Sequence, residues 1–435
     1  MKTNRTLSCL FLFCCSLLLS FSLFAAEKTQ FSKVVFFGDS LSDMGNNQDG
    51  LSDQSPVTNK VIDPQSAGGY KTGDVWSVSF VRYLKQDGFL TSSATIEVKP
   101  SIDFDKQIEI KPTDSIDFAY SGDPSDGYAF ESGRYVVQYH QYQHENDKCV
   151  DSLPPDPASA NNLCGAKNRA RDFAATQDVD PNALYVIWIG ANDVLQDLGE
   201  RLQNDIQNAM ETGVPIAQSE LDAMQTQAAQ TILHTTASIG YTIYELHAKG
   251  AQYFMVPNLP NIGLTPSGYD ANFLYSMWFP QQKDMVLKLF TDLTNGFNGM
   301  LKKQLDSIPL EHPVAQPDVT QLFDMARDGK LAAFPASTSA VNVTPVKQWL
   351  DTCCTNATEM TNPQAYDPAQ CKPDDQELCS NQHIPTLPQG GHYLFYNGIH
   401  PTTCTAKYIA KYFESYLPGG EGVFDPSQNL CSENE

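Results

Sequence analysis

Short apolar runs alternate along the chain with longer segments of helical character, and this alternation constrains the fold more than any other feature. The apolar runs cover residues 31–37, 117–120, 184–189 and 253–256. Short continuous runs that are rich in β-branched and aromatic residues are typical of strands buried on both faces. The intervening sequence predicts helices over residues 74–86, 217–248, 282–308 and 403–417. Strands alternating with helices predict an α/β fold in which helices cover both faces of a central parallel sheet.

Three of the predicted strands lead directly into a short turn that contains glycine. Ser40 follows the first strand, Gly122 follows the second, and Asn192 follows the third. In open parallel sheets, ligands bind outside the carboxyl ends of the strands. The three turns are expected at that same edge, so the sequence predicts a functional site there.

The chain has 435 residues, which is within reach of one large domain that carries insertions. Residues 145–181 and 335–390 interrupt the strand–helix alternation, because both are polar and contain many proline and asparagine residues. We therefore expect a single domain over residues 27–435 with these two segments as surface insertions. Loops of this length are commonly functional or held by disulfides.

The first 26 residues have the features of an export signal. Lys2 and Arg5 form a positive start, an apolar run over residues 7–24 follows, and Ala25 and Ala26 supply small residues for cleavage. We expect a signal peptide over residues 1–26 and a secreted or periplasmic protein. An uncleaved anchor is the alternative, since the run is nearly long enough to span a bilayer. No later segment is apolar over such a length, so no stable membrane span is expected in the mature protein.

Eight of the 11 cysteines lie beyond the predicted signal peptide. An even number of cysteines in an exported chain favours disulfides, and the best candidate pair is Cys149–Cys164, which would close a polar loop. Zinc binding is the alternative for a second group of residues, but this group lacks a Cys-x-x-Cys pair and no metal is expected. Its members are Cys353, Cys354, Cys371, Cys379 and His383.

The formal net charge is −23 at pH 7. Such a charge repels nucleic acid and anionic membrane surfaces at long range, so neither is expected as a partner. Solubility outside the cell is the simplest account of this excess of acidic residues.

Four short stretches resemble, in the same order, the conserved blocks of the GDSL/SGNH esterase–lipase family. They are FGDSLSD at 37–43, DFAYSGD at 117–123, IGAND at 189–193 and GIHPT at 398–402. The resemblance covers residues 37–125, 184–266 and 393–417. It is greatest to the larger bacterial members, a group that contains lysophospholipases and glycerophospholipid:cholesterol acyltransferases.

This resemblance implies a three-layer α/β/α SGNH-hydrolase fold, here with long disulfide-bearing insertions, and a reaction without a cofactor. Ester hydrolysis needs a nucleophile, a base and donors for the developing oxyanion. By the resemblance, Ser40 is the nucleophile and His400 is its base. The oxyanion donors would be the backbone N–H groups of Ser40 and Gly122 and the side-chain amide of Asn192.

One position departs from the family pattern. The family places Asp three residues before the histidine, whereas this chain has Asn397 there. An Asn oxygen can accept a proton from His400 and orient the ring, but it cannot stabilise the imidazolium by charge. Three hypotheses remain open: a dyad oriented by Asn397, a different carboxylate in place of the Asp, or weak activity.

The expected activity is a serine esterase or lipase that cleaves acyl esters of lipids, with water or an alcohol such as a sterol as acceptor. The aromatic residues Tyr275, Trp278 and Phe279 favour an acyl-chain substrate. A carbohydrate acetyl or feruloyl esterase of the same fold is the first alternative, and a non-catalytic secreted binding protein is the second. Related acyltransferases have a disulfide loop whose cleavage activates them, so a protease acting within 150–163 is a further expected partner, with a purely stabilising loop as the alternative.

Overall fold

The computed structural model describes residues 28–44, 46, 69–70, 73–101, 108–120, 122–126, 128–131, 134–137, 165–335, 394, 400–401 and 403–431. Its centre is a five-stranded sheet in the order β4-β5-β1-β8-β9. The strands are β4 (Val98–Pro100), β5 (Ser115–Asp117), β1 (Val34–Gly38), β8 (Leu184–Trp188) and β9 (Tyr253–Met255). Every neighbouring pair in this sheet is parallel, so the expected fold class is confirmed.

The two central strands are buried over their whole length, as their continuous apolar sequences predict. In β1 and β8 all five residues are buried, and the register places Gly38 opposite Trp188. Alternate side chains point to opposite faces of a sheet, which divides the core into two parts. Val35 and Phe37 pack on one side, and Val34 and Phe36 pack on the other.

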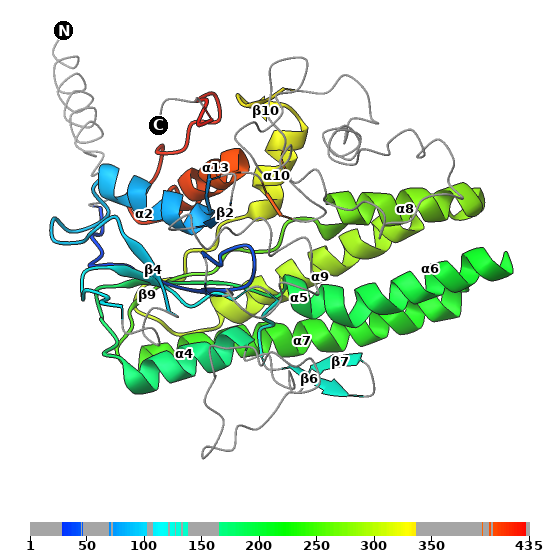
Figure 1. The fold of residues 1–435 in the computed structure, drawn as a ribbon, viewed down its shortest axis with the longest axis horizontal. Helices are drawn as coiled ribbons and strands as arrows, with labels where there is room; N and C mark the ends of the chain where they lie inside the picture. The colour runs from blue at the N-terminus through cyan, green and yellow to red at the C-terminus, as the bar shows by residue number, and fades with distance from the viewer. Residues whose placement is uncertain are drawn as a thin grey trace, which may run out of the picture.

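Helices cover both faces of the sheet and complete three layers (Figure 1). On the Val34 face lie α2 (Trp76–Gln86), α10 (Val319–Arg327) and α13 (Thr403–Glu414). On the Val35 face lie α4 (Gly165–Thr176), α7 (Gln218–Ala248) and α9 (Met285–Asp306). The predicted helices at 74–86, 217–248, 282–308 and 403–417 are therefore present, with ends that differ by a few residues.

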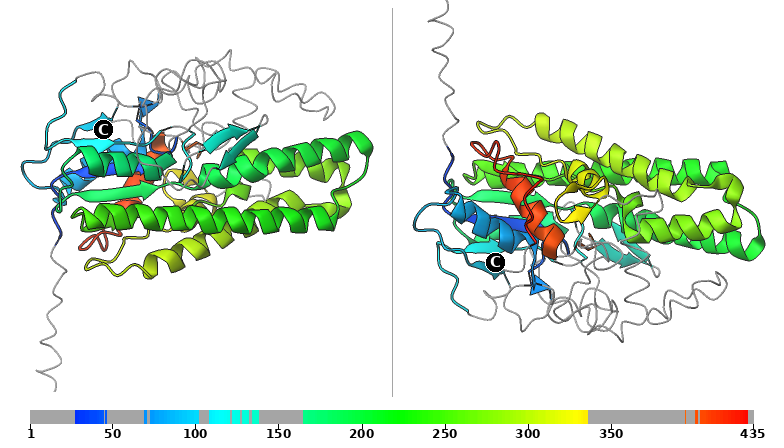
Figure 2. Two further views of the ribbon diagram at one scale, coloured as in Figure 1. Left: turned by 90° about the horizontal axis from the view of Figure 1, so that it is seen from below. Right: turned by 90° about the horizontal axis from the view of Figure 1, so that it is seen from above.

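A group of helices continues past the carboxyl edge of the sheet, as both views in Figure 2 show. It contains the far parts of α7 and α9 together with α6 (Glu200–Thr212) and α8 (Pro266–Trp278). The short helix α5 (Ala191–Val194) and a π-helical turn, η1 (Leu195–Gly199), join β8 to α6. Two 3-10 turns, η2 (Ile262–Leu264) and η3 (Pro280–Gln282), flank α8.

Three small antiparallel hairpins complete the described secondary structure. They pair β2 (Gly69–Tyr70) with β3 (Gly73–Asp74), β6 (Tyr128–Glu131) with β7 (Arg134–Val137), and β10 (Lys330–Leu331) with β11 (Phe334–Pro335). Among the helices of the described residues, none combines the length and apolar character needed to cross a membrane.

Part of one expected insertion belongs to the core. Residues 165–176 of the segment 145–181 form α4, whose Ala166, Ala170 and Phe173 are buried in the cluster on the Val35 face. The expectation of a surface insertion is wrong for these residues, because their apolar side chains recur at helical spacing among charged ones. Residues 145–164 of the first expected insertion and residues 336–390 of the second, expected over 335–390, lie outside the described residues.

The disulfide of the described chain joins Cys404 to Cys431. It connects the first turn of α13 to the tail of the chain over a sequence separation of 27 residues. The sequence favoured disulfides but did not select this pair. The candidate pair Cys149–Cys164 lies outside the described residues.

Candidate active site

The turn after β1 presents Ser40 at the carboxyl edge of the sheet. The Asp39 carbonyl oxygen accepts hydrogen bonds from the backbone N–H groups of Ser42 and Asp43, both at 3.0 Å. The Asp39 carboxylate accepts a further bond from the N–H of Leu41 at 3.0 Å. A glycine is required immediately before this turn, since a Cβ at Gly38 would lie 2.7 Å from the Trp188 carbonyl oxygen.

Ser40 and His400 are directly bonded although they lie at opposite ends of the sequence. His400 Nε2 is 2.8 Å from Ser40 Oγ. Both are buried, with exposed fractions of 8% for Ser40 and 2% for His400. His400 immediately precedes Pro401 and the start of α13, so the helix sets the position of the ring. This distance allows a proton to pass from the hydroxyl to the imidazole.

Burial lowers the pKa of His400 to about 4, because desolvation disfavours the charged imidazolium. The ring is therefore neutral at neutral pH. A neutral imidazole that carries its N–H proton on Nδ1 can accept the proton of the Ser40 hydroxyl at Nε2. The charge state at neutral pH is the one that a general base requires.

Gly122 lies in a turn beside the end of β1. The N–H of Tyr120 donates to the Gly38 carbonyl at 3.1 Å, and the N–H of Asp123 donates back to the Tyr120 carbonyl at 3.0 Å. Gly122 has φ +88°, a left-handed conformation that glycine adopts without strain. The second predicted strand is thus shifted: it was expected over residues 117–120, whereas β5 spans Ser115–Asp117.

Asn192 follows β8 in the first turn of α5. Gly190 before it has φ +122°, and a Cβ there would lie 2.5 Å from the Phe297 ring. The Asn192 side-chain amide donates to the backbone carbonyl of Asp123 at 2.9 Å. The second and third predicted site residues therefore belong to one bonded unit, in which Asn192 is tied to the Gly122 turn.

A narrow pocket opens beside Ser40. It is lined mainly by apolar side chains. Ser40 and Asn192 both line it, and Thr265 stands at the start of α8. The other lining residues are Asp39, Leu41, Trp188, Ala191, Leu195, Pro260, Ile262, Phe323, Pro401 and Ile409. The site therefore combines a polar reacting group with an apolar wall.

Buried carboxyl groups surround the site, and the sequence did not single them out. Asp39 lines the pocket with an exposed fraction of 1%, and its Oδ2 has no hydrogen-bond partner among the described residues. Desolvation raises its pKa to about 7. Asp117 is also buried and accepts bonds from the N–H groups of Met44 and Ala119. The sequence could have indicated both carboxyl groups, since Asp39 and Asp117 belong to the quoted sequence blocks and lie at the ends of β1 and β5.

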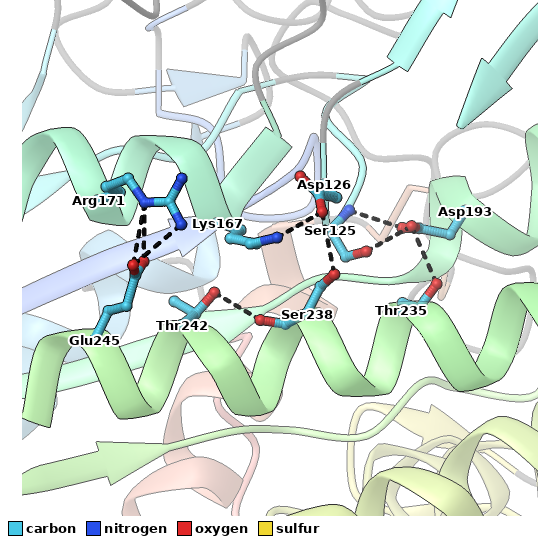
Figure 3. A network of polar contacts seen from close by, with 9 residues as sticks. All are labelled: Ser125, Asp126, Lys167, Arg171, Asp193, Thr235, Ser238, Thr242 and Glu245. Atoms are coloured by element: carbon cyan, nitrogen blue, oxygen red, sulfur yellow. Dashed lines mark hydrogen bonds and ion pairs between the residues drawn. The ribbon is translucent and has the colours of Figure 1, made fainter. Parts of the chain in front are cut away.

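The Asp193 carboxylate anchors the segment after the Gly122 turn to the helices beneath it (Figure 3). It accepts bonds from the Ser125 N–H at 2.9 Å, the Ser125 hydroxyl at 2.7 Å and the Thr235 hydroxyl at 3.1 Å. Desolvation raises the pKa of Asp193 to about 6, and these bonds oppose that shift. The contacts of Asp193 therefore indicate that it holds this segment in place.

The structure brings together four of the predicted residues: Ser40, His400, Asn192 and the turn of Gly122. Asn397 lies outside the described residues. In the described part of the chain, no group of three or more His, Cys, Asp or Glu side chains is arranged to hold a metal ion.

In a comparison with protein families, the model of the GDSL-like lipases and acylhydrolases matches residues 34–413. No curated protein matches the chain significantly. The matched range includes both ends of the Ser40–His400 pair and extends over most of the chain. The protein therefore belongs to the GDSL-like lipase/acylhydrolase family and is an ester-hydrolysing enzyme.

Proposed function

We propose that the protein is an exported serine hydrolase that cleaves acyl esters of lipids, with Ser40 as nucleophile and His400 as its base. The observation that carries the proposal is the 2.8 Å separation of His400 Nε2 from Ser40 Oγ, beside a largely apolar pocket that Ser40 lines. Ser40 Oγ attacks the ester carbonyl carbon while His400 Nε2 takes the hydroxyl proton. The tetrahedral intermediate then expels the alcohol, which receives that proton from His400, and an acyl-enzyme on Ser40 remains.

The oxyanion of the intermediate needs hydrogen-bond donors close to Ser40. The backbone N–H groups of Ser40 and Gly122 and the Asn192 amide are the proposed donors. In support, Asn192 lines the same pocket as Ser40, and the Gly122 turn is bonded both to β1 and to Asn192.

The nucleophile is tested by Ser40→Ala, with Ser79→Ala in α2 as a control at another buried serine. Hydrolysis of a p-nitrophenyl ester is expected to fall about 10⁴-fold or more in Ser40→Ala, and labelling by a fluorophosphonate probe is expected to vanish. The control should keep both. Full activity in Ser40→Ala would refute the assignment. Failure of the unmodified protein to react with the probe would favour a non-catalytic binding protein.

The lipid ester is preferred to a carbohydrate ester because of the apolar pocket wall beside Ser40. Of the aromatic residues that suggested an acyl chain, Tyr275 and Phe279 are buried core residues, whereas Trp278 is 42% exposed. A panel of p-nitrophenyl esters from acetate to palmitate separates the two classes. Lipid specificity predicts kcat/KM rising with chain length, and a maximum at acetate would favour the carbohydrate esterase.

The second substrate of the acyl-enzyme is either water or an alcohol. Phospholipid cleavage, lysophospholipid cleavage and transfer to a sterol share the same acyl-enzyme and differ only in donor and acceptor. Fatty acid released and steryl ester formed, measured in one reaction with phosphatidylcholine and cholesterol, give the balance between them.

The role of Asn397 is proposed as orientation of His400 in a dyad. Asn397→Asp restores the acidic residue of the family pattern and should raise kcat about tenfold or more, whereas Asn397→Ala should lower it. An unchanged or lower kcat in Asn397→Asp would instead favour another carboxylate in that role.

Export and activation are proposed from the sequence alone. A mature N-terminus at residue 26 or 27, determined on protein recovered from outside the cytoplasm, would support the signal peptide. For activation, limited proteolysis within 150–163 is expected to raise turnover under conditions that preserve disulfides. Unchanged turnover after confirmed cleavage would leave a stabilising loop as the explanation.

A further inference from the structure

A buried arginine on α4 lies against the turn that contains Gly122. Arg169 Nε donates to Asp123 Oδ2, and Arg169 Nη2 lies 3.4 Å from Asp123 Oδ1. The guanidinium carbon lies 3.4 Å from the centroid of the Tyr120 ring. Arg169 therefore contacts side chains on both sides of Gly122, one through its planar face and the other through its N–H edge.

The same turn holds Asn192 through its main chain. The Asn192 amide donates to the carbonyl of Asp123, the residue whose side chain Arg169 binds. A displacement of Asp123 would therefore move the Gly122 turn and release the Asn192 amide together. Two of the three proposed oxyanion donors depend on the position of this one residue.

The ion pair is almost completely removed from solvent. The exposed fraction of the side chain is 7% for Arg169 and 0% for Asp123. Burial raises the pKa of the Asp123 carboxyl group, and the charge and hydrogen bonds of Arg169 oppose that shift. A buried ion pair is weak evidence for stability, because an apolar pair of similar volume would often serve as well. Its retention here calls for a role that depends on geometry.

The far end of the segment has anchors of its own. Asp193 holds Ser125, Lys167 binds Asp126 at 2.8 Å, and the Ser238 hydroxyl lies 3.4 Å from the same carboxylate (Figure 3). The N–H of Ala166 also donates to the Pro124 carbonyl. Residues 124–126 are thus fixed without Arg169, whereas the Asp123 carboxylate, nearer Ser40 in the chain, is held by Arg169 together with the backbone N–H of Gly165.

We propose that Arg169 is a positioning residue for the oxyanion hole, because it clamps Tyr120 and Asp123 around Gly122 and thereby aims Asn192. This inference rests on the proposed catalytic function of Ser40. Arg169 does not itself touch the reacting atoms. Its effect is expected in the stabilisation of the transition state and not in the binding of substrate.

The test uses the full chain with Arg169→Lys and with the double variant Arg169→Met/Asp123→Asn. Arg169→Lys keeps the charge but loses the two-pronged contact and the planar stacking on Tyr120. The double variant removes both charges, so it leaves no unpaired ion in the core. The matched control is Arg171→Met on the same helix, since Arg171 pairs with Glu245 and does not contact the turn.

In variants that retain the circular dichroism spectrum of the unmodified protein, kcat is expected to fall about 10–10²-fold with KM changed less than about threefold. The inhibition constant of an alkyl trifluoromethyl ketone, which forms a tetrahedral adduct on a serine, should rise by the same factor as kcat falls. Arg171→Met should leave both quantities unchanged.

Three results would overturn the proposal. The first is an unchanged kcat in the folded double variant. The second is a higher KM with an unchanged kcat. The third is a lower kcat without weaker binding of the ketone. The proposed function has a separate test. It fails if Ser40→Ala keeps its activity, whatever the Arg169 variants show.

Discussion

His400 is almost completely buried beside Ser40. The cost of that burial falls on the protonated form of the imidazole, and this lowers the pKa of His400 to about 4. The hydroxyl of Ser40 instead faces a neutral nitrogen over the whole physiological range. The pH at which the base is lost is therefore set by burial.

Activity is expected to rise with pH through about 4 and to stay high above about pH 5, because only the neutral ring accepts the serine proton. The measurement is kcat/KM for a short-chain ester between pH 3.5 and 8, with circular dichroism at each pH as a control for unfolding. A midpoint at 6.5 or above in the folded enzyme would contradict it. Since the pKa is lowered, His400 also makes the folded state lose stability as pH falls below the ordinary value of 6.5.

Asp39 shows the opposite shift, because burial raises the pKa of its carboxyl group from 3.8 to about 7. Its contribution to stability is present below pH 3.8 and is lost as pH rises through about 7. Asp39→Asn keeps an acceptor for the Leu41 N–H and should increase the free energy of unfolding at pH 8 by up to about 4 kcal/mol. Urea unfolding at pH 8 and pH 4.5 measures this, and a gain of equal size at both pH values would contradict it.

At the scale of elements, the sequence predicted the positions of the main strands and long helices better than it predicted their exact ends. Apolar runs located β1, β8 and β9, and the absence of turn residues located α7 (Gln218–Ala248). The helix α4 was missed because its buried apolar side chains are few and mostly small (Ala166, Ala170 and Phe173), so its amphipathic pattern is weak.

The residues of the site also differ in how well the sequence predicts them. The sequence blocks identified Ser40, His400, Gly122 and Asn192, since each block is a local pattern. The buried partners of these residues were not predicted. Arg169 lies 46 residues after Asp123, and nothing local to either one indicates the ion pair. Contacts between elements depend on three-dimensional packing that periodicity does not encode.

The Cys404–Cys431 disulfide is expected to stabilise the junction between α13 and the C-terminal tail. A cross-link over 27 residues stabilises a folded protein by about 3–4 kcal/mol through the entropy of the unfolded chain. Cys404→Ser and Cys431→Ser should each lower the free energy of unfolding by about this amount, and the double variant by no more than either. The measurement is thermal unfolding without reductant. Additive losses in the double variant would show that the two cysteines act separately.

At the scale of the whole molecule, one apolar face of α8 is uncovered. Phe273 is 59% exposed, and Met277 and Trp278 are each 42% exposed. The helix begins directly after Thr265, which lines the pocket beside Ser40, and continues away from the sheet (Figure 1). Exposed aromatic and aliphatic residues on one helix face are typical of binding to a lipid surface. The excess of negative charge limits such a surface to uncharged or zwitterionic lipid.

The double variant Phe273→Ser/Trp278→Ser is expected to bind phosphatidylcholine vesicles several-fold more weakly and to hydrolyse them more slowly, while cleaving a soluble short-chain ester at the normal rate. Leu233→Ser/Tyr244→Ser on α7 is the control, because these large apolar side chains are also exposed, at 54% and 64%. Co-sedimentation with vesicles measures binding. Equal losses in both double variants, or a loss with the soluble ester, would rule out a role of α8 at the lipid surface.

The reacting serine and histidine are separated by 360 positions in the chain. A growing or shortened polypeptide that stops before residue 400 holds one member of the pair and lacks the other. The nucleophile is thus translated almost first and its activator almost last. On the proposed mechanism, a chain under synthesis is therefore expected to have no hydrolytic activity until residue 400 has been added and has folded beside Ser40.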